Sequence, residues 1–420
     1  MKWERGNSRS GGWCDILVGT TMSNPYLPAE LLDHVVDLLH DAEDALRNCC
    51  LVSKSWVPRT RQHLFADIRF NVAKRLRSWK ETFQDPSTSP AYYAKTLSVN
   101  CLPAVTVADA EAGGWIRSFS RVVVLKLADT QGTCINELAS YLVPFHGFSP
   151  AIKSLSVKVF ILPSSHIINL ILSFPLLEDL TVVTYIALAD DNDGLDALPT
   201  TVLPSTPPMT GSLSLFRRKG LKPLARRLLS LPGGVHFQKL DLTLFCEEDI
   251  SFAMAFVEGC SRTLKYLDIS CGHLGTTIQH FVHTDNSLLS VAEPKSAPID
   301  LSRVAGLENV AFRVSSQTVS WVTMALQSVA PEHRDLRRIS IYLPYDLTLV
   351  NDDTDIRRSL GETVSGWWSD LDRLLVEFWE SRSIRPRVGC TRWGEGGQDT
   401  EYCIRCLLPE ITKRGIVDPT

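Results

Sequence analysis

The organisation of the chain follows from residues 27–70, LPAELLDHVVDLLHDAEDALRNCCLVSKSWVPRTRQHLFADIRF. Pro28 suits the first turn of a helix, because its fixed φ is helical and its missing N–H would have no partner there. Within Leu31–Leu39 apolar residues recur at three- and four-residue steps, the spacing of an amphipathic helix. A second apolar run ends near Ser53 and a third ends at Phe65. The stretch predicts three short helices with a very small core of their own, so we expect this module to dock onto a partner.

The spacing of three groups of residues in this stretch is typical of a known module. The groups are Leu27-Pro28-x-Glu30-Leu31-Leu32, then Leu51-Val52-Ser53-x-x-Trp56, then Leu64-Phe65. Together they resemble the F-box, the three-helix module by which substrate receptors attach to the Skp adaptor of SCF-type ubiquitin ligases, and in particular the F-box proteins of mushroom-forming fungi. The resemblance implies that some residues pack the module and others contact the adaptor, among them Leu27, Pro28, Leu31, Leu32, Val35, Leu51, Val52, Ser53 and Trp56.

The resemblance also implies a function. An F-box receptor binds cullin through the Skp adaptor and binds a protein substrate through its remaining residues. It is not an enzyme, because ubiquitin transfer in the family belongs to the RING subunit and its conjugating enzyme. Two alternatives stay open at this stage: a non-ligase F-box scaffold, and an α/β enzyme. For the enzyme the sequence offers no nucleophile elbow, P-loop, dinucleotide fingerprint or zinc-protease motif.

Composition narrows the class of partner. Lysine and arginine number 43 against 47 aspartates and glutamates, so no global field favours nucleic acid or an anionic membrane, and we expect a protein partner. The most apolar long window, residues 167–189, contains Pro175, Glu178 and Asp179, too polar for a membrane span. Eleven cysteines without a regular framework, and no signal-peptide pattern, favour the cytoplasm or nucleus.

A repeated apolar pattern begins after residue 90. An apolar residue is followed by others three and five positions later, as in Val122/Leu125/Leu127 and Leu264/Leu267/Ile269. Successive copies are mostly 25 to 33 residues apart, with one step of 43, and helical patterns lie between them. A short strand plus a helix at this period resembles a leucine-rich repeat. The asparagine or cysteine expected beyond the strand is misplaced or missing, which favours an irregular solenoid, while a doubly wound α/β domain is the alternative.

These patterns give a predicted domain organisation. The fold class is α+β overall: a three-helix F-box followed by an irregular leucine-rich-repeat-like α/β solenoid. Residues 1–23 are a disordered lead, 24–70 the F-box, 71–90 a helical connector and loop, and 91–420 the solenoid with C-terminal capping helices.

One constellation could hold a metal. Cys271, His273, His280 and His283 place four possible ligands within thirteen residues. Because a compact zinc module has more turn residues between its ligand pairs, we expect ordinary surface histidines here and no cofactor.

Overall fold

The computed structural model describes the chain in segments, with short gaps between them. The described residues are 28–85, 88–106, 109, 114–129, 141–159, 164–184, 209–217, 222–231, 233–244, 247–271, 297–314, 318–329, 333–343, 356–390, 400–416 and 418–419. They fall in two compact units, Met1–Leu64 and Phe65–Thr420. Residues 1–23 lie outside the described residues, and so does Leu27.

The first unit contains three helices, α1 (Ala29–Leu38), α2 (Glu43–Val52) and α3 (Val57–Leu64). Its described core is small. The buried side chains are Val36, Leu46, Cys49 and Thr60. The Thr60 hydroxyl has a partner at the start of α3, because it donates to the carbonyl oxygen of Trp56 at 2.7 Å.

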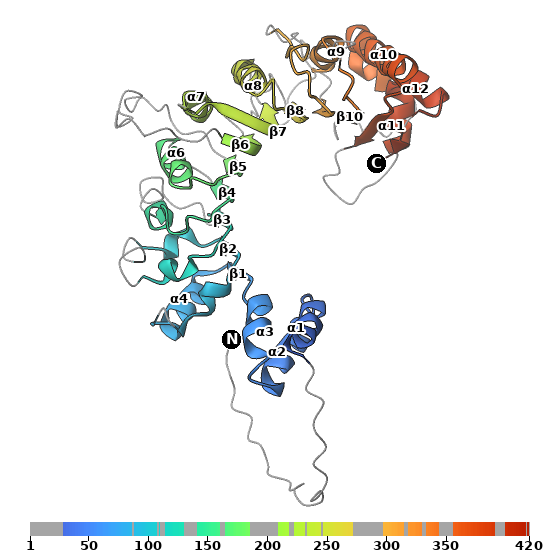
Figure 1. Ribbon diagram of the computed structural model, residues 1–420. Helices are drawn as coiled ribbons and strands as arrows, with labels where there is room; N and C mark the ends of the chain where they lie inside the picture. Colours follow the sequence, from blue (N-terminus) through green and yellow to red (C-terminus); the bar gives the residue numbers. More distant parts are fainter. Residues whose placement is uncertain are drawn as a thin grey trace, which may run out of the picture. The chain divides into compact units, whose positions relative to one another are not determined.

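The second unit is built on one sheet (Figure 1). The described strands are β1 (Asp67–Phe70), β2 (Thr96–Val99), β3 (Val124–Ala128), β4 (Ser154–Val159), β5 (Asp179–Thr184), β6 (Met209–Arg217), β7 (Val235–Leu244), β8 (Tyr266–Cys271), β9 (Asn309–Arg313), β10 (Arg338–Leu343), β11 (Pro386–Cys390) and β12 (Asp418–Pro419). They lie in the sheet in sequence order, and every neighbouring pair is parallel.

Helices occupy the crossovers between these strands. The α-helices are α4 (Ala73–Thr82), α6 (Ser164–Leu172), α7 (Lys222–Leu229), α8 (Glu247–Gly259), α9 (Val319–Gln327), α10 (Ile356–Arg382), α11 (Thr400–Leu407) and α12 (Pro409–Lys413). Short 3-10 turns are η2 (Pro90–Tyr93), η3 (Leu102–Ala104), η5 (Trp115–Phe119) and η6 (Val143–Phe145). Figure 1 shows α4, α6, α7 and α8 on one side of the row of strands β1–β8. None of the described helices is both long and apolar enough to cross a membrane.

The predicted fold class is wrong. The sequence indicated an α+β chain in which a three-helix F-box precedes an irregular leucine-rich-repeat-like solenoid from residue 91. The structure is instead of the α/β type, with a continuous all-parallel sheet of twelve described strands and helices interleaved between them. The sheet begins at Asp67, inside the segment assigned to the F-box. Parallel neighbours need a crossover connection, so regular strand–helix alternation produces this class.

The doubly wound alternative does not describe the sheet either. A doubly wound sheet reverses its strand order at a switch point, where its ligands bind. The order of the described strands follows the sequence from β1 to β12 without a reversal. Among the described strands there is therefore no switch point at which to seek an active site.

The two faces of the sheet differ in polarity. On the face toward the core, an in-register row consists of Leu97, Leu125, Leu155, Leu180, Leu213, Leu240, Leu267, Val310 and Ile339, all buried. On the opposite face runs a row that we call the outer row: Arg69, Ser98, Lys126, Ser156, Thr181, Ser214, Asp241, Asp268, Ala311, Ser340, Arg387 and Asp418. Its members from Lys126 to Ala311 are half-buried or exposed. Because side chains alternate along a strand, one face builds the core and the other stays polar.

A glycine lies where β6 changes its register against β7. Gly211 has φ +86°, and the pairing of β6 with β7 shifts by one residue between Gly211 and Ser212. A Cβ atom at this position would overlap the carbonyl oxygen of Glu178. Glycine is therefore required both for the backbone angle and for the close approach.

Candidate functional site

An exposed apolar stripe runs along α1. Leu31, Val35 and Leu38 are spaced by four and three residues, so they lie on one side of the helix. Their exposed fractions are 51%, 44% and 70%, whereas Val36, the next residue after Val35, is only 1% exposed. The helix thus directs one apolar side chain into the small core and three toward solvent. We call these three residues the α1 stripe.

A second exposed apolar group lies at the end of α2. Leu51 is 85% exposed and Val52 is 69% exposed. The helix ends there because Ser53 adopts an extended conformation, and its hydroxyl accepts the backbone N–H of Ser55 at 3.3 Å. Such a side chain to backbone bond competes with helix continuation. The turn leaves both apolar side chains in solvent.

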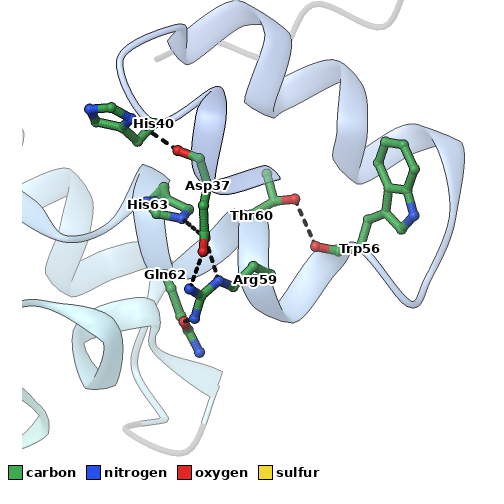
Figure 2. Close-up of polar contacts among 7 residues, drawn as sticks. All are labelled: Asp37, His40, Trp56, Arg59, Thr60, Gln62 and His63. Carbon is green, nitrogen blue, oxygen red and sulfur yellow. Dashed lines mark hydrogen bonds and ion pairs between the residues drawn. The ribbon is translucent and has the colours of Figure 1, made fainter. Parts of the chain in front are cut away.

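The structure divides the residues that the sequence singled out. Pro28 precedes α1 and is exposed, together with Leu31, Val35, Leu51 and Val52. Leu32, Ser53 and Trp56 are half-buried. The backbone carbonyl of Trp56 accepts the Thr60 N–H at 2.9 Å as well as the Thr60 hydroxyl, so the residue marks the start of α3 (Figure 2).

Leu38 belongs to the α1 stripe, although it was not among the adaptor-binding residues predicted from the sequence. It lies three residues after Val35 and so on the same side of α1, and it is more exposed than either of its partners. The apolar spacing could have identified it. The resemblance to the F-box did not extend to this position.

A charged cluster ties α1 to α3 (Figure 2). The Asp37 carboxylate accepts two hydrogen bonds from Arg59, at 2.6 Å from Nε and 2.5 Å from the terminal nitrogen. The Nε2 atom of His63 lies 2.8 Å from the same carboxylate, and Arg59 also donates to Gln62 at 2.9 Å. The Arg59 hydrogen bonds, followed by that of His63, hold the pKa of Asp37 well below its usual range. A bidentate arginine–carboxylate pair fixes geometry.

This cluster has a consequence for the apolar surface. Asp37 directly precedes Leu38 and follows Val36, the side chain of α1 that is buried. Anchoring Asp37 to α3 therefore sets the rotation of α1, and that rotation keeps the stripe on the solvent side. The cluster positions the surface and was not predicted, because its members are 22 and 26 residues apart in the sequence.

The proposed metal-ligand set falls largely outside the described residues, since His273, His280 and His283 are not among them. Cys271 ends β8, where burial raises the pKa of its thiol to about 12 while a hydrogen bond involving Thr318 lowers it. A thiol held neutral in a core is a poor metal ligand. Within the described residues there is no group of three or more histidine, cysteine or acidic side chains able to hold an ion.

Comparisons with known proteins add no relative. No protein-family model matches the chain, and no curated protein matches it in sequence.

Proposed function

We propose that the chain is a substrate receptor that docks onto a Skp-type adaptor through its first unit and, by way of that adaptor, onto cullin. The observation that carries this proposal is the α1 stripe. Three large apolar side chains on one side of a helix, in a unit whose described part buries so few residues, are suited to helix-to-helix docking. The resemblance of residues 27–70 to the F-box names the partner.

Energetics support a docking role for the stripe. Fully burying a leucine or valine side chain contributes about 1.5–3 kcal/mol of free energy. A half-exposed one would therefore still gain about 1 kcal/mol on complete burial against a partner. The α1 stripe and the α2 end together supply five such side chains. Exposed apolar side chains that lie together on one side of a helix, as those of the α1 stripe do, are typical of a binding surface.

The second unit takes the role of the substrate platform in this proposal. Its sheet presents the polar outer row, and its described residues carry no catalytic motif, in keeping with a receptor that leaves the chemistry to other subunits. A protein acting before ubiquitin transfer works in the cytoplasm or nucleus, which is where we place it.

The test is co-expression with a fungal Skp adaptor, followed by size-exclusion chromatography. The variant Leu31→Ser with Val35→Ser should lose the stoichiometric complex that the natural chain forms. A matched control is Leu176→Ser with Val143→Ser, because these second-unit residues are exposed to 53% and 44%, nearly as Leu31 and Val35 are. The control should bind normally, since exposed substitutions away from a site usually change stability by only about 0.5 kcal/mol.

Two results would contradict the proposal. One is the absence of any complex with the natural chain. The other is equal loss of the complex in the control, which would show a general surface effect. Addition of cullin to the purified complex then separates a ligase subunit from a scaffold, since only the former should co-elute with cullin.

A further inference from the structure

A cavity lies between α4 and the 3-10 turn η3. Its volume is about 270 Å³, and its described lining consists of Ala73, Arg77, Cys101, Pro103 and Ala104. Arg77 is the only charged residue in that described lining. Sites for small molecules are typically larger, about 300–1,000 Å³. The cavity is therefore suited to a single apolar side chain, with a guanidinium beside it.

Hydrogen bonds hold the walls of this cavity. The ammonium group of Lys80 on α4 donates to the carbonyl oxygen of Ala104 at 3.3 Å and to the carboxylate of Asp109 at 2.7 Å. The thiol of Cys101 donates to the carbonyl oxygen of Phe70 at 3.4 Å. These bonds tie α4 and β1 to the segment around η3. They also engage the carboxylate of Asp109, which is therefore already paired with a cation of the same helix.

Two other cations of α4 have no anionic partner among the described residues. Lys74 and Arg77 are both exposed, and neither forms an ion pair in this part of the chain. Glu81 lies one turn after Arg77, yet no ion pair joins them. Like charges three residues apart on a helix repel each other. The first turn of α4 contains no acidic residue, so Lys74 also lies unfavourably near the positive end of the helix dipole.

The combination of an apolar cavity with flanking cations favours an acidic protein segment over other anions. Single-stranded nucleic acid binds where aromatic rings stack on its bases, and the described lining of the cavity contains no aromatic residue. Recognition of an anionic membrane uses clusters of about four to eight lysines and arginines, more than these two. A protein segment supplies both an apolar side chain and carboxylates. Figure 1 shows α4 on the helix side of the strands, away from the outer row.

We propose that the cavity between α4 and η3, with Lys74 and Arg77 beside it, docks an acidic segment of a protein partner. One apolar side chain of the segment occupies the cavity, and a neighbouring carboxylate binds Arg77. A guanidinium can hold a carboxylate through two parallel N–H groups, which fixes its orientation. Charge complementarity selects this occupant. The inference goes beyond the proposed function, because docking of the segment requires neither the adaptor nor cullin.

The test measures the anisotropy of a fluorescein-labelled peptide, a leucine with two glutamates on each side, mixed with the purified full chain at about 0.15 M salt. Arg77→Gln should weaken binding about tenfold, the loss expected for a charge-assisted hydrogen bond. Serine in place of the peptide's leucine should also weaken binding about tenfold, because the cavity is left unfilled.

The matched control is Arg75→Gln, which removes another exposed arginine from the same helix. Residues two apart on a helix do not face the same side, and Arg75 is not part of the described lining of the cavity. The control should therefore bind the peptide within about twofold of the natural chain.

Several results would overturn the inference. Absence of binding by the natural chain would remove the docking site, and equal weakening by both variants would indicate general electrostatic attraction. Equal affinity for the serine peptide would show that the cavity is not used, and tighter binding of a single-stranded oligonucleotide would assign the cations to nucleic acid. The adaptor complex, measured in parallel, should be unchanged in Arg77→Gln, and its loss would assign the cavity to the adaptor instead.

Discussion

Asp241 of β7, whose register partner on β8 is Asp268, makes a pH-dependent prediction about stability. Replacing Asp241 with asparagine removes the charge but keeps the shape of the side chain. The pKa of Asp241 is about 6 in the folded chain against an ordinary 3.8. Between these two pH values the folded state therefore holds a proton that the unfolded state has released. The protonated aspartate contributes stability that is fully present below about pH 4 and lost as the pH rises through about 6.

The magnitude follows from these two pKa values. The difference between 3.8 and about 6 sets a ceiling of about 3 kcal/mol in the free energy of unfolding. Asp241 is only half-buried, and solvent screening reduces that ceiling to about 1 kcal/mol. In a chain of this size such a change corresponds to a rise in Tm of about 2 °C or less.

The assay is thermal unfolding of the natural chain and Asp241→Asn at about pH 4 and about pH 7.5, on either side of the titration. The two proteins should melt together at the lower pH, and the variant should be the more stable at the higher pH. The control is Asp179→Asn, which changes an exposed carboxylate of β5 that accepts a hydrogen bond from Ser212 at 2.6 Å; it should follow the natural chain at both pH values. Burial, and then the charge of Asp268, raise this pKa, so an equal gain at both pH values, or a less stable variant at the higher one, would refute the argument.

Three further variants test the structure. Gly211→Ala should destabilise the second unit by about 3 kcal/mol, since the new Cβ meets the Glu178 carbonyl at a positive φ; Gly366→Ala, on an open side of α10, should instead gain up to about 1 kcal/mol. Similar Tm values for both would argue against the tight approach. Asp37→Asn should weaken adaptor binding, though less than loss of Leu31 and Val35, because it loosens α1 from α3; full binding in a pull-down would show that the cluster does not position the stripe.

Local sequence determined where the strands lie. In the triplet Leu264/Leu267/Ile269 all three side chains are buried, and the last two lie in β8 on the face toward the core. The triplet Val122/Leu125/Leu127 places β3 in the same way. Alternation of apolar residues is a property of neighbouring positions, so the sequence alone can display it.

The sequence located the candidate surface only in part. It selected Leu31 and Val35, which are exposed, but it could not separate them from the half-buried Leu32. An apolar stripe wider than the core it faces has both buried and exposed members. Which member faces inward depends on how α1 is rotated against α3.

Tertiary structure alone decided the fold class and the contacts between residues that are distant in sequence. The fold class was mistaken because a strand period does not state which strands join one sheet, and here the sheet begins at Asp67, inside the segment assigned to the F-box. Asp241 and Asp268 are 27 residues apart and unremarkable in sequence. Only the register of β7 against β8 brings them together. Likewise, Asp37 accepts hydrogen bonds from Arg59 only because α1 packs against α3. Contacts between distant residues depend on register and rotation, which local patterns do not encode.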